Sequence, residues 1–200
     1  MVNRTFIFLS IFFYLITFNL YSDEQISFDV TEIEILDGGN KIIGKNRGII
    51  NSNNEITIEA DEFEFDKTKN ILQAKGNILI KDRINEYNFS AQDITYDINE
   101  ERIELQGKAK ASIDTNYKFN SQNILILRKE MIVSSDVGAT IIDEINQIRY
   151  KIGKFSYSLS EETLKGEKIF IHTNYNQPFS DKYFFKSAVF NLKNQNYIAQ

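Results

Sequence analysis

The sequence contains no cysteine or tryptophan, and only one histidine and one proline among its 200 residues. Without cysteine the chain can form no disulfide, and it offers no thiolate for metal binding or redox chemistry. The lone His172 has no second imidazole for a metal pair, and no nucleophile-elbow sequence accompanies it. We therefore expect no metal, no cofactor and no enzymatic activity, with stability coming from apolar burial and backbone pairing.

Positive charge is also scarce. The chain has 23 Lys and Arg against 28 Asp and Glu, a net charge of −5, and no basic cluster stands out along the sequence. This balance argues against a nucleic acid as partner. The acidic residues at 59, 61, 62 and 64 alternate with apolar ones, which is typical of the solvated face of a strand rather than of an acid–base pair. The DGGN stretch at 37–40 has the composition of a hairpin turn.

The first 22 residues differ from the rest of the chain. Arg4 precedes an uncharged, mostly apolar run of 16 residues from Thr5 to Leu20, and Ser22 precedes the acidic start of the remainder. This is the layout of a secretory signal peptide, and the run is shorter than the ~20 residues of a comfortable membrane span. We expect residues 1–22 to be cleaved after export, with an uncleaved membrane anchor as the alternative.

A change of phase in the hydrophobic alternation is the main structural signal. In ITIEADEFEF (56–65), apolar residues occupy even positions as far as Ala60 and odd positions from Phe63. Successive side chains of a straight strand point to opposite faces, so such a switch indicates a bend or bulge. The switch occurs six times, 30 to 35 residues apart, and the first apolar residues after it are Ile33, Phe63, Ile94, Ile124, Phe155 and Phe190.

Each phase change is followed by a polar turn and a second alternating run that reaches a glycine. The glycines are Gly76, Gly107 and Gly166, and Gly44 and Gly138 hold similar places. We expect each glycine to lie at the bend of its strand, where the absence of a side chain avoids crowding. Self-similarity of this kind is the mark of a repeat architecture. The repeat predicts an all-β fold, an open β-jelly roll of bent antiparallel hairpins whose two sheets meet in a V, within one domain over 23–200.

Two sets of residues are candidates for binding. Those expected to face a groove between the sheets are Ile33, Ile35, Ile58, Phe63, Phe65, Phe89, Ile94, Tyr96, Phe119, Ile124, Ile126, Phe155 and Tyr157. The outermost strands, near 26–36 and 183–192, would carry unpaired backbone groups able to dock another sheet edge, next to Phe28, Val30, Phe190 and Leu192. The alternative is a structural β-repeat scaffold or adhesin with a filled core and no ligand.

The repeat also resembles a known family. The unit I-x-A-D-x-F-x-[FY]-D followed by A-x-G-N-[IV] appears as ITIEADEFEFD and LQAKGNI, which resembles the OstA-like repeat of lipopolysaccharide transport proteins. Segments 28–48 and 169–199 are similar to the periplasmic part of LptD-type assembly proteins. The resemblance implies a jelly roll that accepts the acyl chains of lipid A, with lipopolysaccharide and other jelly-roll transport proteins as partners through edge-to-edge strand addition. It leaves open an LptA-like soluble or LptC-like anchored member, and association with the outer membrane if a barrel follows.

Overall fold

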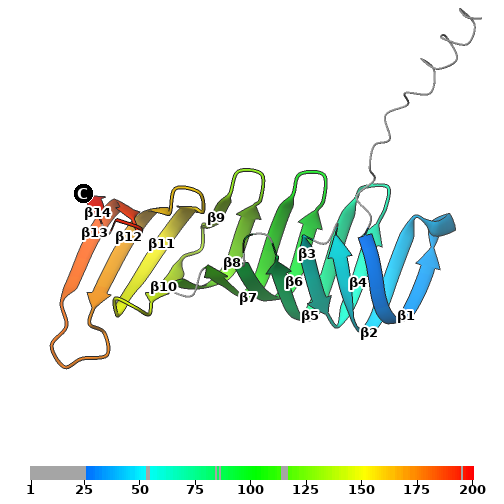
Figure 1. Ribbon diagram of the computed structural model, residues 1–200, viewed down its shortest axis with the longest axis horizontal. Helices are drawn as coiled ribbons and strands as arrows, with labels where there is room; N and C mark the ends of the chain where they lie inside the picture. Colours follow the sequence, from blue (N-terminus) through cyan, green and yellow to red (C-terminus); the bar gives the residue numbers. More distant parts are fainter. Residues whose placement is uncertain (1–25, 53–54, 84, 86, 114–116, 195) are drawn as a thin grey trace, which may run out of the picture.

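The computed structural model describes residues 26–52, 55–83, 85, 87–113, 117–194 and 196–200. In these residues fourteen strands pair in antiparallel fashion into one continuous, elongated sheet that runs from β1 at one end to β14 at the other (Figure 1). The expected signal peptide at 1–22 lies outside the described residues. Within the described ranges, no helix is long and apolar enough to cross a membrane.

Most strands are 10 to 12 residues long and are joined by short turns. The strands are β1 (Ile26–Leu36), β2 (Lys41–Ser52), β3 (Ile56–Ala60), β4 (Glu62–Asp66), β5 (Ile71–Asp82), β6 (Tyr87–Asp97), β7 (Arg102–Ile113), β8 (Tyr117–Leu127), β9 (Ile132–Ser135), β10 (Ala139–Asp143), β11 (Ile148–Ser158), β12 (Thr163–Thr173), β13 (Lys182–Asn191) and β14 (Asn196–Ala199). The DGGN turn contains a short 3-10 helix, η1 (Asp37–Gly39).

Nearly every long strand bends near its middle. In β5 the first half pairs with β4, the register shifts between Lys75 and Ile78, and the second half pairs with β3. The aligned bends form a line of corners that divides the sheet into two layers. Layer 1 comprises residues 32–36, 41–45, 62–66, 71–75, 93–97, 102–106, 123–127, 132–135, 154–158, 163–167, 187–191 and 196–199. Layer 2 comprises residues 26–30, 48–52, 56–60, 78–82, 87–91, 109–113, 117–121, 139–143, 148–152, 169–173 and 182–185.

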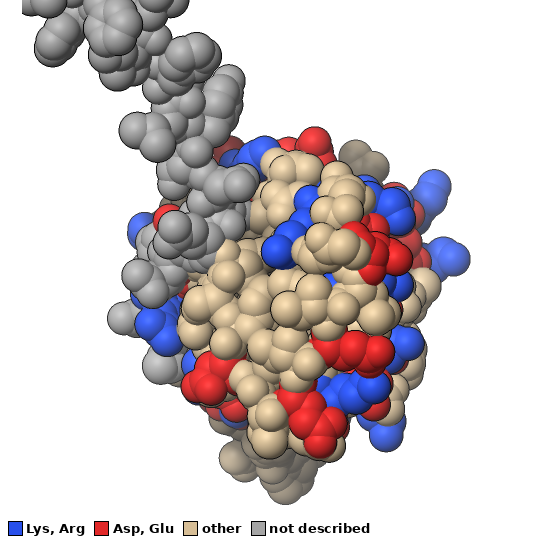
Figure 2. All heavy atoms as spheres, turned by 90° about the vertical axis from the view of Figure 1, so that its right-hand side faces the viewer, with Lys and Arg blue, Asp and Glu red and all other residues tan. Residues whose placement is uncertain are grey.

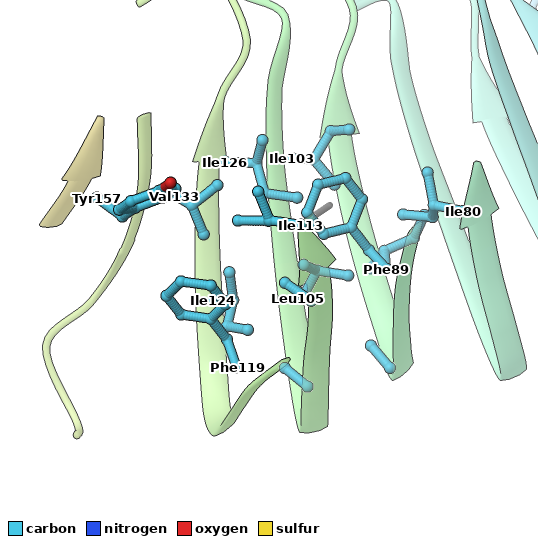
Figure 3. Packing of buried hydrophobic residues seen from close by; sticks show 14 of the residues in the cluster. Ile80, Phe89, Ile103, Leu105, Ile113, Phe119, Ile124, Ile126, Val133 and Tyr157 are labelled. Carbon is cyan, nitrogen blue, oxygen red and sulfur yellow. The ribbon is translucent and has the colours of Figure 1, made fainter. Parts of the chain in front are cut away.

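The two layers face each other across the hydrophobic core. Phe119 of layer 2 lies 5.6 Å, between ring centroids, from Phe155 of layer 1, and Phe28 lies 5.9 Å from Phe65. Figure 3 shows side chains from several hairpins meeting in this interior. The expected all-β architecture of bent antiparallel hairpins is confirmed. The phase change keeps apolar side chains inside on both sides of each corner, since Ile58 and Phe63 are both buried despite their opposite parity.

The corner at Asp61 explains the pairing of Ala-Asp with Gly-Asn in the repeat. Gly76 and Asn77 both adopt left-handed backbone angles, with φ of 75° and 45°. The Asn77 side-chain amide donates to the Asp61 carboxylate at 2.7 Å, and a Cβ on Gly76 would lie only 2.5 Å from that carboxylate. Glycine is therefore required both for its backbone angle and for space.

The same corner recurs one repeat later, where Gly107 has φ of 70° and faces Gln92. Gly138 has φ of 88° and lies where the chain passes from β9 to β10. Two other expectations were wrong. Gly44 and Gly166 lie before the bend, opposite Phe63 and Phe155, because their corners use the left-handed residues Asn46, Arg47 and Lys168.

The sixth unit also differs from the expected spacing. Phe190 pairs with Leu164, which pairs with Tyr157, so Phe190 belongs to the row of Tyr157. The residue equivalent to Phe155 is Ala188, since both pair with Gly166. Part of the gap of 35 residues thus arises because a small residue occupies the first inward position of the last hairpin, and the rest comes from the longer connection between β12 and β13.

Replacing Gly107 by valine should destabilise the fold by about 1–3 kcal/mol, because a β-branched residue is disfavoured at positive φ and its Cβ would collide with Gln92. The free energy of unfolding in urea measures this. Gln106→Val is the matched control, since Gln106 precedes the corner in the same strand and its side chain is exposed. Equal midpoints for the two variants would show that the corner does not need glycine.

Candidate functional site

The candidate site is the interior between the two layers. Eleven of the expected groove residues are buried there with their side chains on the inward faces: Ile58, Phe63, Phe65, Phe89, Ile94, Tyr96, Phe119, Ile124, Ile126, Phe155 and Tyr157. They come from both layers and from hairpins along most of the sheet, so the interior is one continuous apolar core. Every second residue of successive strands contributes, which is why the alternation identified them.

The remaining two, Ile33 and Ile35, are not in the closed interior. Both lie on the inward face of β1, in register with Gly44 and Ile42, but they are 50% and 63% exposed. The physical reason is their position: among the described residues, β1 pairs only with β2 and ends the stack. Figure 2 looks onto this end of the molecule, where an uncharged area is bordered by charged side chains. The apolar interior thus opens to solvent at the β1 end.

Side chains fill most of the interior, and described residues line two cavities at its open edge, the side opposite the corners. The central cavity, of about 250 Å³, is lined by apolar residues that include Phe89, Ile103 and Ile126. The C-terminal cavity, of about 380 Å³, is lined mainly by aromatic and aliphatic residues that include Tyr150, Ile171 and Phe190. Both cavities have polar groups from the turns at their mouths.

Two buried carboxylates lie at these mouths, and sequence reasoning missed them. Asp82 accepts hydrogen bonds from the backbone N–H and side-chain amide of Asn85, both at 3.0 Å. Asp143 is held in the same way by Asn146, at 2.9 and 2.8 Å. The signal was present, because DRIN at 82–85 and DEIN at 143–146 follow the same pattern after a strand. Each turn thus satisfies an inward-facing carboxylate at the rim of the core.

Arg128 joins the two layers across the open edge. It lies in the turn after β8 in layer 1, and its guanidinium contacts Glu101 at 3.1 Å, Glu55 at 3.5 Å and Asp82 at 3.6 Å. Glu55 and Asp82 belong to the layer 2 ends of their hairpins. The side chain of Arg128 is only 12% exposed. Burial opposes its charge, but Tyr96, Asp82 and Glu101 outweigh burial and raise the pKa of Arg128.

The C-terminal cavity holds no such arginine among its lining residues. Burial, reinforced by Asp143 and Tyr117, raises the pKa of the Tyr150 hydroxyl far above its usual value, so this ring stays neutral. Tyr150 packs edge-on against Phe190 with 5.7 Å between ring centroids, and the Tyr117 hydroxyl donates to the backbone carbonyl of Leu192 at 3.5 Å. These contacts also connect the two layers.

The edges of the sheet differ from expectation at the C-terminal end. The strand expected to be outermost, β13, is covered in layer 1 by β14, and it forms the edge only in its first half, in layer 2. Phe190 and Leu192 are buried at 5% and 7% exposure, so they cannot line an open edge. The reason is a further hairpin, since the turn after Asn191 returns the chain as NYIA. Phe28 and Val30 do lie on the edge strand β1, half-buried.

His172 lies on the outward face of layer 2, because its position in β12 has the opposite parity to the buried Ile169 and Ile171. It pairs with Arg149 and Lys182 in the neighbouring strands, and its Nε2 lies 2.8 Å from the Ser180 hydroxyl. This hydrogen bond gives one ring nitrogen of the half-buried imidazole a polar partner. It lies outside the apolar interior.

No family model and no curated sequence matches the chain. Among solved structures, the chain is similar to LptH, described as the LptA homologous periplasmic component of the conserved lipopolysaccharide transport device from Pseudomonas aeruginosa. The similarity has a TM-score of 0.48 and 13% identity, and it covers 52% of this chain and 76% of that chain.

Replacing Arg128 by leucine should destabilise the protein by about 3 kcal/mol at neutral pH, because the buried Asp82 carboxylate would lose its cation. Chemical denaturation measures the change. The double variant Arg128→Leu, Asp82→Asn should recover much of the loss, since it leaves no buried charge unpaired. The control is Arg102→Leu, which breaks an exposed pair with Glu104 and should cost less than about 1 kcal/mol. Equal losses for the two arginines would contradict a joining role for Arg128.

Proposed function

We propose that the chain carries lipopolysaccharide in the periplasm, holding acyl chains of lipid A between the two layers. The observation that supports this most is the continuous apolar interior, exposed at Ile33 and Ile35 at the β1 end and hollow beside Tyr150 near the other end. The resemblance of the sequence repeat to OstA-like transport proteins supplies the substrate class. The sugar and phosphate groups of the lipid remain in water.

Acyl binding requires the layers to separate, because the interior is largely filled by side chains. Each CH₂ removed from water contributes about 0.8 kcal/mol, so a chain of a dozen carbons can offset the loss of several side-chain contacts between the layers. The corners act as the hinge, since the strands continue through them. Separation then breaks contacts at the open edge, among them the ion pairs that Arg128 forms with Glu55 and Asp82.

The packed interior itself favours a second candidate function, a structural β-repeat scaffold that binds no ligand. Ile58, Ile80 and Phe119 are at most 1% exposed, which is the packing of an ordinary core. An apolar fluorescent probe distinguishes the two functions. A carrier gives saturable binding that lipopolysaccharide displaces, whereas a filled scaffold gives none.

A photo-crosslinking amino acid at Phe65 or Ile94 should capture lipopolysaccharide in cells, because both side chains point between the layers. The captured lipid is detected as a shifted band with an antibody against lipopolysaccharide. The matched controls are Glu64 and Thr95, which are adjacent in sequence and point outward from layer 1. Equal capture at inward and outward positions would exclude the interior as the binding site.

We also propose that the β1 edge docks onto another jelly-roll transport protein by strand addition. Among the described residues, β1 has a partner on one side only, and its inward face carries the exposed Ile33 and Ile35. An added strand would pair with the β1 backbone and cover these side chains, which would make one interior continuous with the next. Exposed edge strands otherwise invite aggregation.

The double variant Ile33→Ser, Ile35→Ser should weaken this docking at least tenfold, while the free energy of unfolding changes by less than about 1 kcal/mol because both side chains are already exposed. Pull-down with the purified jelly-roll partner measures docking. The control, Glu32→Ser with Glu34→Ser, alters the opposite face of the same strand. Undiminished docking of the isoleucine variant would place the contact elsewhere.

A further inference from the structure

The outer face of layer 2 gathers positive charge that is dispersed along the sequence. Two rows of outward residues cross β7, β8, β10, β11, β12 and β13 in register. One row is Lys110, Asn120, Thr140, Lys151, Phe170 and Phe184, and the other is Ser112, Lys118, Ile142, Arg149, His172 and Lys182. Neither row contains an acidic residue. The sequence has no basic cluster, but the folded protein has one, because the cross-strand register brings lysines together that are distant in sequence.

A hollow of about 770 Å³ lies beside these rows, toward the corners. Four lysines line it, Lys108, Lys110, Lys151 and Lys168, and the described lining contains no acidic residue. Together with Lys118, Arg149 and Lys182 they form what we call the basic face. Lys118 is paired with Glu144 at 2.7 Å. Among the described residues, none of the four hollow lysines lies within 4 Å of a carboxylate, although the chain as a whole is acidic.

Exposed apolar side chains border the basic face. Phe184, paired with Phe170, is 72% exposed, and Ile145 and Phe179, on the turns at the end of these strands, are 67% and 91% exposed. The two turns lie side by side, since the Tyr175 N–H donates to the Gln147 carbonyl at 3.3 Å and Asn176 donates to the Gln147 side chain at 2.6 Å. Figure 1 shows the loop between β12 and β13 extending beyond the turns of the other hairpins.

We propose that the basic face binds the surface of an anionic phospholipid bilayer. Cationic side chains near such a surface are attracted to the headgroup phosphates, and apolar side chains on protruding turns can enter the interface. The face spans six strands, a width of about 25 Å, which suits a broad surface better than a small ligand. The exposed Ile145 and Phe179 lie on turns at the end of the strands rather than among the lysines, which places them to enter the headgroup region. This inference is independent of lipid binding in the interior.

The test uses the absence of cysteine in the full chain, which allows one fluorophore to be placed at one position. An environment-sensitive fluorophore on Phe179→Cys should shift to shorter wavelength with vesicles containing phosphatidylglycerol, and not with vesicles of phosphatidylcholine alone. The same fluorophore on Ser160→Cys, an exposed turn of layer 1, should not respond. The apolar residues 1–22 could attach the chain to either kind of vesicle, so vesicle binding alone does not show which face contacts the lipid. The readout is therefore the difference between the labels at positions 179 and 160.

The triple variant Lys110→Gln, Lys151→Gln, Lys182→Gln in the Phe179→Cys background should weaken the response on the order of 100-fold, as expected for the loss of three cations near an anionic surface. The matched control removes the same charge from layer 1 and its turns, with Lys67→Gln, Lys75→Gln and Lys165→Gln, and should leave the response unchanged. Three outcomes would overturn the proposal: equal responses at positions 160 and 179, equal effects of the two triple variants, or a response to single-stranded DNA but not to vesicles.

Discussion

The corner is the constraint on which the whole structure depends. In a strand that passes from one layer to the other, the inward residues must switch between even and odd positions at the bend. The neighbouring strand must bend at the position that pairs with it. The Asp61 carboxylate, held by the Asn77 amide opposite Gly76, shows how one hairpin satisfies both conditions. Because the corners align, every hairpin adds one strand pair to each layer, and the apolar interior becomes continuous without any long-range motif.

The sequence predicts the bends of the strands well, but it predicts the contacts between turns at the open edge poorly. Parity identifies which side chains face inward, so Phe63 and Phe155 could be assigned from alternation alone. Glycine is a less certain guide, because left-handed backbone at Arg47 and Lys168 replaces it at two corners, while Gly44 and Gly166 are small for a different reason, their proximity to Val30 and Ile152 respectively. The pairing of Arg128 with Glu55, Asp82 and Glu101 could not be predicted, because these residues lie at the ends of different strands and meet only through packing across the open edge.

The charge on the outer face escaped prediction for a related reason. Outward positions are free to vary because solvent accepts any polar side chain there, so no pattern along one strand reveals what the neighbouring strands carry. Only the register brings Lys110 and Lys151 into one row. The inward residues of each strand therefore determine the fold, whereas the outward residues determine the charge on the outer surface of each layer.

A filled interior and a carrier function are compatible only if the two layers are held together less strongly than the strands within each layer. Backbone hydrogen bonds run within the layers and through the corners, whereas side-chain packing and groups such as Arg128 and Tyr117 act between the layers. Apolar contacts between side chains can be exchanged for contacts with an acyl chain at little net cost, but backbone hydrogen bonds cannot. The fold thus confines any opening to one direction, away from the corners and toward the turns.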